Sequence, residues 1–187
     1  LLVLLGVLEG TGKIAYKGKS FAAKDLEKVR SFTGILFQNP DDQLYSKVVE
    51  DIVASDLVYQ GLTKGEIKKR VDAALDLVGI KEVARRRLDQ LSGGQRKKVA
   101  IASILAAKPD FLILDEPCTG LDPQARLEFI DMLCLLPKTM LVLSHDPELI
   151  ARLTERVYVL SEGQIVRSGN TREILADQAL MFDCGIA

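Results

Sequence analysis

The stretch of sequence that decides the fold is Phe111-Leu112-Ile113-Leu114-Asp115-Glu116-Pro117. Its apolar residues follow one another without alternation, which is typical of a parallel strand covered on both faces. Ligands of open α/β sheets bind at the carboxyl ends of such strands. We therefore expect the two acids to act on a ligand: Asp115 by holding Mg²⁺, directly or through water, and Glu116 by orienting and deprotonating an attacking water. Taken alone, the same residues also fit a strand that runs into a solvated acidic turn.

Strand and helix signals alternate on both sides of this stretch. Further strands are predicted at 13–17, 33–37 and 140–143, and an antiparallel pair at 157–160 and 164–167. Helices are predicted at 121–136 and from Asp146-Pro147-Glu148 onward, where proline takes the first helical position. Such alternation is typical of the α/β class.

The segment between 41 and 108 is helical in pattern. Thr63 and Glu66 form a capping box, after which apolar residues recur at helical spacing until a glycine ends the helix. A second helix follows the turn Ser92-Gly93-Gly94 and stops before Pro109. We therefore expect an α/β fold that is interrupted by an all-helical lobe.

Length, composition and charge exclude several classes of protein. The 187 residues suit one domain with an inserted lobe, at about 150 residues per domain. Hydrophobic residues make up 48% and charged residues 27%, as in ordinary globular proteins, which disfavours disorder. The net charge of -1 gives no overall field that would hold nucleic acid.

The sequence indicates neither a membrane span nor a disulfide framework. The apolar runs 1–8 and 100–107 are far shorter than the ~20 residues that cross a bilayer. The run 1–8 also lacks the basic start and the cleavage site of a secretory signal, so we expect it to be core. The cysteines, Cys118, Cys134 and Cys184, are odd in number and have no C-x-x-C spacing. They indicate reduced thiols in a cytosolic protein and no zinc site.

A second chemical motif lies upstream, at Leu91-Ser92-Gly93-Gly94-Gln95. Its glycines allow the backbone to approach a ligand, and the N-terminus of the following helix presents free N–H groups. The motif therefore indicates anion binding. Ser-Gly-Gly by itself would also fit a flexible loop that caps a helix.

The order and spacing of the motifs resemble those of the ATP-binding-cassette ATPases. The matching motifs are Gln38 after a strand (Q-loop), Leu91 to Gln95 (signature), the strand ending in Asp115 and Glu116 (Walker B), Gly120-Leu121-Asp122 (D-loop) and Ser144-His145 (switch histidine). The resemblance runs over essentially the whole chain. It implies an α/β fold of the P-loop NTPase type, with a mostly parallel sheet and an inserted all-helical subdomain. Residues 1–187 then form a single ATPase domain, with an ATP-binding core at 1–40 and 111–187 and a helical, signature-bearing subdomain at 41–110.

The same resemblance implies a role for each motif residue in binding ATP and Mg²⁺ and in hydrolysing ATP. Glu116 is the base, and Asp115 organises Mg²⁺. His145, the sole histidine of the chain, contacts the γ-phosphate and helps to hold the attacking water. Gln38 senses Mg²⁺ and the γ-phosphate and relays changes to the helical lobe. The residues that help to bind the nucleotide are Ser92, Gly93, Gly94, Gln95 and Asp122.

The resemblance also implies partners. Two ATPase domains would pair head to tail around two nucleotides, either as a homodimer or with a related chain. The surface around Gln38 and the helical lobe would grip integral membrane transport subunits, which places the protein at the cytoplasmic face of the cell membrane. Two alternatives stay open: a soluble ATPase of the same superfamily, acting in iron-sulfur assembly or translation, and a catalytically silent interaction module.

The stretch Leu36-Phe37-Gln38-Asn39-Pro40-Asp41-Asp42-Gln43-Leu44 narrows the resemblance. It looks like the ATPase subunits of energy-coupling-factor and cobalt/nickel importers, in which a similar acidic string follows the Q-loop glutamine. This implies uptake of a metal ion or a vitamin, with the substrate chosen by a separate membrane component. The sequence departs from the pattern at Ser46-Lys47-Val48, which lacks the usual Pro-Thr, and at Cys118, where Thr is common.

The phosphate-binding loop G-x-x-x-x-G-K-[ST], which an ATPase of this class needs, does not occur in the sequence. The stretch Gly10-Thr11-Gly12-Lys13 has the wrong spacing, since the first glycine would fall at Val7 and the hydroxyl residue at Ile14. It also precedes a predicted strand, so we interpret it as a surface turn. Residues 1–5 instead resemble the helix that follows this loop in the family. We therefore expect the loop, the first strand and the aromatic residue that stacks on adenine to lie just before Leu1 in a longer protein, and these 187 residues alone to be inactive.

Overall fold

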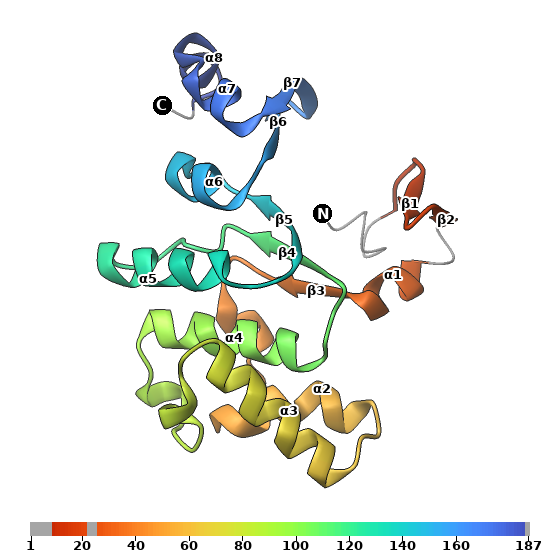
Figure 1. Cartoon of the computed structure of the whole chain (residues 1–187), viewed down its shortest axis with the longest axis vertical. Helices are drawn as coiled ribbons and strands as arrows, with labels where there is room; N and C mark the ends of the chain where they lie inside the picture. Colours follow the sequence, from red (N-terminus) through yellow and green to blue (C-terminus); the bar gives the residue numbers. More distant parts are fainter. Residues whose placement is uncertain (1–8, 22–25, 186–187) are drawn as a thin grey trace.

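The core of the fold is a three-stranded parallel sheet. The computed structural model describes residues 9–21 and 26–185. The strands lie in the order β3 (Thr33–Leu36), β4 (Phe111–Asp115) and β5 (Thr139–Leu143), as Figure 1 shows. Leu36 pairs with Leu114, and Asp115 pairs with Leu143, so the carboxyl ends of the strands lie side by side. The predicted parallel sheet is thus confirmed.

The central strand β4 is buried, as its unbroken apolar sequence predicts. Leu112, Ile113 and Leu114 are each 0% exposed. Helix α5 (Pro123–Cys134) connects β4 to β5, and helix α4 (Gly93–Ala106) packs against β3. The approach of α4 is very close, because a Cβ atom on Gly34 of β3 would lie 2.2 Å from Cγ2 of Ile104. Glycine at this position is what allows the helix to lie on the sheet.

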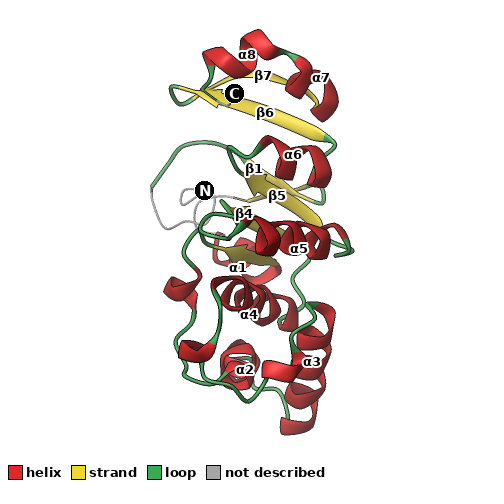
Figure 2. Cartoon of the chain, turned by 90° about the vertical axis from the view of Figure 1, so that its left-hand side faces the viewer, coloured by secondary structure: helices red, strands yellow, loops and turns green. Residues whose placement is uncertain are grey.

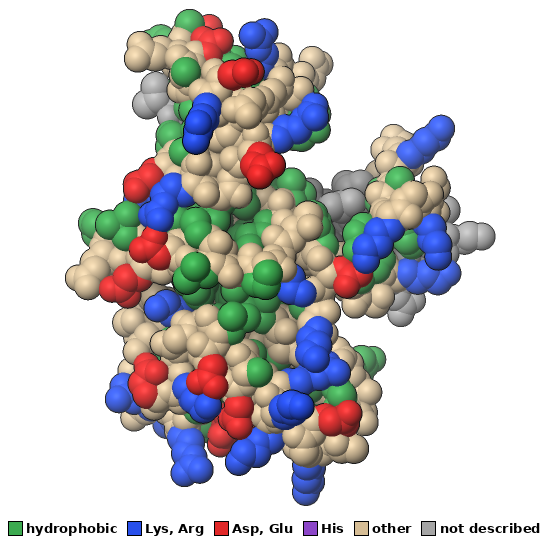
Figure 3. All heavy atoms as spheres, in the orientation of Figure 1, with side chains coloured by type: hydrophobic (Ala, Val, Ile, Leu, Met, Phe, Trp, Pro, Cys, Tyr) green, Lys and Arg blue, Asp and Glu red, His purple; other side chains and the backbone are tan. Residues whose placement is uncertain are grey.

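The chain between β3 and β4 forms the helical lobe. It contains α2 (Val49–Tyr59), α3 (Lys64–Leu77) and α4, with short 3-10 turns η2 (Pro40–Gln43), η3 (Lys81–Val83) and η4 (Leu88–Gln90). The α-helices pack against one another below the sheet in the view of Figure 1. The predicted capping box is present, since the N–H of Thr63 donates to Oε2 of Glu66 (3.1 Å) and the N–H of Glu66 donates to Oγ1 of Thr63 (3.4 Å). Figure 3 shows acidic and basic side chains mixed over the outer surface of this lobe.

Helix α4 begins earlier than the sequence predicts. The predicted turn at residues 92–94 is wrong, because Gly93 and Gly94 belong to the first turn of the helix and Ser92 is its N-cap. The Oγ atom of Ser92 accepts from the N–H of Gln95 (3.3 Å), and Oε1 of Gln95 accepts from the N–H of Ser92 (3.1 Å). This capping box stabilises a helix start that the two glycines alone would disfavour.

Two antiparallel hairpins and several short helices complete the fold. They are β1 (Ile14–Tyr16), β2 (Lys19–Phe21), α1 (Leu26–Phe32), α6 (Pro147–Leu153), β6 (Arg156–Ser161), β7 (Gln164–Asn170), α7 (Thr171–Ala176) and α8 (Gln178–Asp183). The predicted C-terminal pair is confirmed: Leu160 pairs with Ile165 across a turn in which Glu162 and Gly163 have φ values of 49° and 77°. Figure 2 shows this hairpin, the parallel sheet and the helical lobe one below another along the long axis.

Two segments near the N-terminus bear on the phosphate-binding loop that the sequence lacks. Residues 10–13 are exposed and precede β1, which agrees with the expected surface position. Residues 1–5, predicted to be the helix after the loop, lie outside the described residues. None of the described helices is long and apolar enough to cross a membrane.

Candidate functional site

The candidate site lies where β4 and β5 end. Glu116, the residue after β4, has a left-handed backbone conformation with a φ of 44°, which is strained for a residue with a side chain. Its N–H donates to the carbonyl of Leu143 (2.9 Å) and so extends the pairing of the two strands by one residue. The bond and the backbone conformation together fix the point at which the chain leaves the sheet.

The carboxylate of Glu116 is held by the residues that follow β5. Oγ of Ser144 donates to Oε2 of Glu116 (3.2 Å), and the backbone N–H of His145 donates to Oε1 (3.1 Å). Nδ1 of His145 lies 2.7 Å from the same Oε1. The Glu116 side chain is 23% exposed, whereas that of His145 is 79% exposed. The two predicted residues are therefore in contact, with the carboxylate mostly covered and the imidazole facing solvent.

This contact defines what the pair can do chemically. The hydrogen bond to Glu116 raises the pKa of His145 above its ordinary value. In the neutral ring a proton on Nδ1 can donate to Glu116, and in the protonated ring Nε2 becomes a donor as well, which suits a phosphate oxygen. One group can thus accept a proton from water while the other donates a hydrogen bond to an anion.

Asp115 lies beside this pair as the last residue of β4. It is partly buried and pairs with Leu143 of β5. Within residues 9–21 and 26–185, no three His, Cys, Asp or Glu side chains gather closely enough to hold a metal ion. Mg²⁺ in nucleotide sites is bound by one or two carboxylates together with the phosphates of the substrate. The donor set therefore fits an ion that is shared with a nucleotide, to which Asp115 would contribute.

The signature and D-loop residues lie at the first turns of α4 and α5, which are adjacent. Ser92 and Gly93 are exposed, and a Cβ atom on Gly94 would lie 3.3 Å from Cβ of Ala125 in α5. Asp122 is the N-cap of α5, and its Oδ1 accepts from the N–H of Ala125 (3.0 Å). The capping box of α4 leaves the N–H groups of Gly93 and Gly94 outside it, so that they can still donate to an anion.

Lys97 of α4 joins two of the motifs and is not among the predicted site residues. It is 3% exposed, and its Nζ donates to the carbonyls of Pro117 (2.8 Å) and Gln38 (3.4 Å). In the part of the chain that the structure describes, no other Lys, Arg, Asp or Glu side chain is buried. Burial lowers the pKa of Lys97. The signal in the sequence is that Lys97, Ile101 and Ile104 follow one another at helical spacing, which places the lysine on the buried face.

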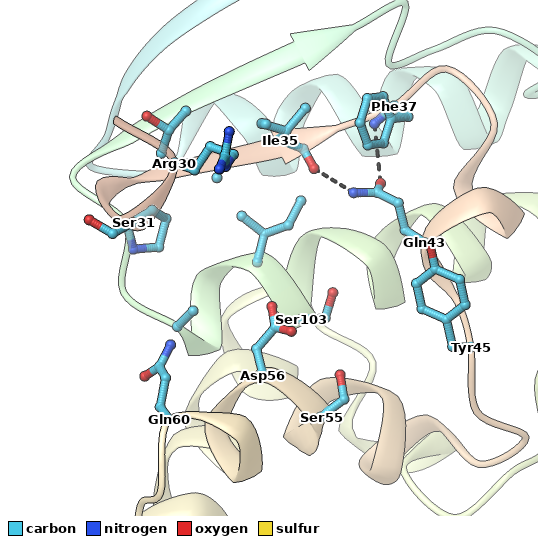
Figure 4. A pocket seen from close by; sticks show the side chains of 15 residues that line it. Arg30, Ser31, Ile35, Phe37, Gln43, Tyr45, Ser55, Asp56, Gln60 and Ser103 are labelled. Atoms are coloured by element: carbon cyan, nitrogen blue, oxygen red, sulfur yellow. Dashed lines mark hydrogen bonds between the residues drawn. The ribbon is translucent and has the colours of Figure 1, made fainter. Parts of the chain in front are cut away.

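Gln38 is exposed and lies two residues after the end of β3, and a second glutamine nearby holds the end of that strand. Nε2 of Gln43 donates to the carbonyl of Ile35 (2.6 Å), and its Oε1 accepts from the N–H of Phe37 (3.1 Å), as Figure 4 shows. The backbone of Gln38 is bonded to Lys97, as described above. The structure thus connects Gln38 with the segment after Glu116 through α4, and leaves its side chain at the surface.

A cavity of about 390 Å³ opens between β3 and helices α2 and α4. Figure 4 shows side chains from the sheet and from the helical lobe around it. Its walls combine aromatic rings with charged and polar groups, among them Arg30, Phe37, Tyr45, Asp56 and Ser103. Phe37, the residue before Gln38, lines the cavity, which lies at the junction of the lobe with the sheet.

Comparison with known proteins identifies the family. A family model described as "ABC transporter" matches residues 1–119, a range that contains the Q-loop, signature and Walker B motifs. The chain belongs to the ABC transporter family. The family resemblance deduced from the motifs is thus confirmed.

The relatives and a solved structure extend this match. Among ABC transporter proteins, the energy-coupling factor transporter ATP-binding protein EcfA of Methanoculleus marisnigri is 38% identical over 94% of this chain and 65% of its own length. The protein of the same name from Methanothermobacter thermautotrophicus is 40% identical over 96% of this chain and 60% of its own length. The structure of cbiO1 from Clostridium perfringens, described as part of the ABC transporter complex cbiONQ, has a TM-score of 0.86 and 34% identity over 99% of this chain and 76% of that chain. This chain thus spans less than two thirds of the length of the two EcfA proteins.

Proposed function

We propose that this chain is part of the ATPase subunit of an ABC importer, and that the full-length subunit binds and hydrolyses ATP. The observation that carries the proposal is the contact of Glu116 with His145 at the carboxyl edge of the sheet, beside Asp115. Glu116 accepts a proton from the attacking water, and His145 donates a hydrogen bond to the γ-phosphate. Asp115 and Gln38 would hold Mg²⁺, which would neutralise charge on the phosphates.

A second ATPase domain completes the site in this proposal. The groups offered to its nucleotide are Ser92, Gly93, Gly94, Gln95 and Asp122. This assignment is supported by the exposure of the first turn of α4 and by its position beside the first turn of α5.

We also propose the division into an ATP-binding core, 1–40 and 111–187, and a helical subdomain, 41–110. Its support is that every strand of the parallel sheet falls in the first part and α2, α3 and α4 fall in the second.

The membrane subunits dock at the cavity between β3, α2 and α4. Its aromatic side chains, Phe37 and Tyr45, offer apolar contact, and its charged side chains, Arg30 and Asp56, can orient a helix end. The cavity lies beside Gln38, because Phe37 lines it. A membrane subunit in the cavity and a nucleotide near Gln38 would therefore each affect the segment that contains Phe37 and Gln38. This docking places the protein at the cytoplasmic face of the cell membrane.

The proposal extends to the class of the imported substrate. The acidic string after Gln38 and the relatives named EcfA favour an importer of a metal ion, cobalt or nickel, or of a vitamin. The membrane components select the substrate. Copurification of the full-length gene product with membrane proteins distinguishes this proposal from a soluble ATPase that acts alone.

The substitution Glu116→Gln tests the proposed chemistry. In the full-length gene product, assembled with its membrane subunits, we expect ATP turnover to fall by about 10²–10⁴-fold, because the base is lost. ATP-dependent dimerisation should persist, because the amide keeps the size of the carboxylate. The matched control is Glu82→Gln, an exposed glutamate in η3, which should turn over ATP like the unchanged protein. Wild-type turnover in Glu116→Gln would refute the role of the base.

A further inference from the structure

Arg126 on α5 forms an ion-pair cluster beside the candidate site. Its Nε and Nη2 donate to Oδ2 (2.8 Å) and Oδ1 (2.7 Å) of Asp146, and its Nη1 donates to Oε2 of Glu148 (2.7 Å). The side chains of Arg126 and Asp146 are only 24% and 20% exposed. A guanidinium that binds a carboxylate with two parallel bonds fixes its orientation as well as its position. The hydrogen bonds from Arg126 also lower the pKa of Asp146, which keeps that carboxylate ionised.

Asp146 transmits this orientation to the residues around the switch histidine. Its backbone N–H donates to Oγ of Ser144 (3.1 Å), and its Oδ1 accepts from the N–H groups of Glu148 (3.1 Å) and Leu149 (3.2 Å) at the start of α6. Ser144 in turn donates to Glu116. His145 therefore lies between two anchored neighbours, and the anchor on its C-terminal side depends on Arg126.

Attachment of α5 to α6 does not by itself explain the cluster. Arg152 of α6 forms a second ion pair with Asp131 of α5, so these helices are joined at another point. Buried apolar residues of α5, among them Phe129 and Ile130, add to its packing. What distinguishes Arg126 is its place next to the switch histidine.

We propose that Arg126 is a positioning residue that holds His145 against Glu116. It does so by orienting Asp146 through their bidentate salt bridge. Asp122 caps α5 one turn before Arg126 and lies at the face offered to the second ATPase domain. The same turn of α5 therefore connects that face with the switch histidine. The consequence for ATP turnover rests on the proposed function, whereas the contact itself can be measured without nucleotide.

The first measurement is the tautomer of His145 by ¹⁵N NMR of this chain at alkaline pH, where the ring is neutral. Because His145 is the sole histidine, the imidazole signals need no assignment. The bond to Glu116 favours the proton on Nδ1, whereas an imidazole without such a partner prefers the proton on Nε2. We expect the Nδ1–H form in the unchanged chain and a shift toward the Nε2–H form in Arg126→Met.

Two further variants make the result decisive. Arg152→Met removes the other ion pair between α5 and α6 and should leave the Nδ1–H form in place. Arg126→Lys keeps the charge but loses the bidentate geometry, so His145 should also shift toward the Nε2–H form in this variant. Arg126→Lys replaces Arg126→Met if the methionine variant does not fold. A wild-type tautomer ratio in a folded Arg126 variant overturns the positioning role, as does an equal shift in Arg152→Met.

The second measurement is turnover of the full-length gene product. We expect Arg126→Met to lower kcat about tenfold with little change in KM for ATP, because the nucleotide-binding groups stay in place. Unchanged kcat overturns the role in catalysis. A failure of the proposed function would instead appear as retained turnover in Glu116→Gln, and it would leave the tautomer result standing.

Discussion

The helical lobe and the carboxyl edge of the sheet are held together by different forces. In the lobe, Leu57, Leu75 and Ile101 are fully buried and meet other apolar side chains from α2, α3 and α4. At the edge, Glu116 and His145 are held by a few hydrogen bonds between groups that keep contact with water. The lobe is stabilised by area removed from water, and the edge by the placement of individual atoms.

This difference teaches where stability and chemistry reside in the molecule. Loss of a buried methyl group in the lobe leaves a cavity that neighbours fill only in part. Loss of a polar group at the edge exposes its partner to water, which replaces the bond. Substitutions in the lobe should therefore change the free energy of unfolding, and substitutions at the edge should mainly change turnover.

The largest expected change in stability is that of Leu75→Ala in α3. We expect the free energy of unfolding to fall by about 2–5 kcal/mol, because the side chain is fully buried and its removal leaves a cavity. Urea denaturation of this chain measures it. Leu77→Ala on the same helix is the control, since Leu77 is exposed and its truncation should cost within about 0.5 kcal/mol. Equal losses in the two variants would contradict the view that burial of apolar side chains stabilises the lobe.

Local patterns in the sequence predict the strands, the capping box of α3 and the acids at the end of β4. These features depend on residues a few positions apart, so spacing alone indicates them. The start of α4 is mispredicted because a capping box at Ser92 outweighs the poor helix propensity of two glycines. The residues of this box, Ser92 and Gln95, stand at the spacing of a capping box in the sequence.

Contacts between distant segments could not be predicted in the same way. Lys97 meets the carbonyl of Pro117, and Arg126 meets Asp146, across 20 residues of chain in each case. Both contacts depend on which way a helix faces and on the register of the sheet. A lysine or arginine in a helix usually lies in solvent, so composition gives no sign of such a partner.

Lys97→Met sharpens the comparison, because Lys97 is a buried residue of the lobe whose hydrogen bonds reach Pro117 and Gln38 outside the lobe. We expect stability to fall by about 1–2 kcal/mol, less than for Leu75→Ala. The carbonyls of Pro117 and Gln38 lose a donor, while the cost of burying a charge disappears, and the methionine fills the same space. Lys98→Met, on the same helix and partly exposed, should be close to neutral. A loss as large as that of Leu75→Ala would mean that the lobe depends on this polar contact as much as on its apolar core.

The pH dependence of the two Lys97 proteins provides a second check. Burial lowers the pKa of Lys97 in the folded chain below its ordinary 10.5, so between these values the unfolded chain binds more protons. The stability of the unchanged protein should therefore rise relative to Lys97→Met as the pH approaches 10.5 from below. A stability difference that is constant with pH would contradict the buried, charged state of the lysine.

The smallest expected effect is the pH dependence of stability at the edge itself. Glu116, with a smaller contribution from Asp146, raises the pKa of His145 above its ordinary 6.5. Below 6.5 the folded and unfolded chains both carry the proton, and the attraction to Glu116 stabilises the fold in full. As the pH rises through the folded pKa, this contribution is lost. The free energy of unfolding of the unchanged protein, minus that of His145→Asn, should therefore be larger on the acid side of this window than on the alkaline side.

Urea denaturation across this window measures the effect. The effect should be small, because the imidazole faces water and salt screens its charge. Added salt should reduce it further. When Glu116→Gln is added to both proteins, their difference in stability should lose most of its pH dependence. The substitution takes away the principal charge that His145 meets. Leu75→Ala should lower stability equally at every pH in the window. If its loss varied with pH as His145→Asn does, the lobe and the edge would not be energetically separate.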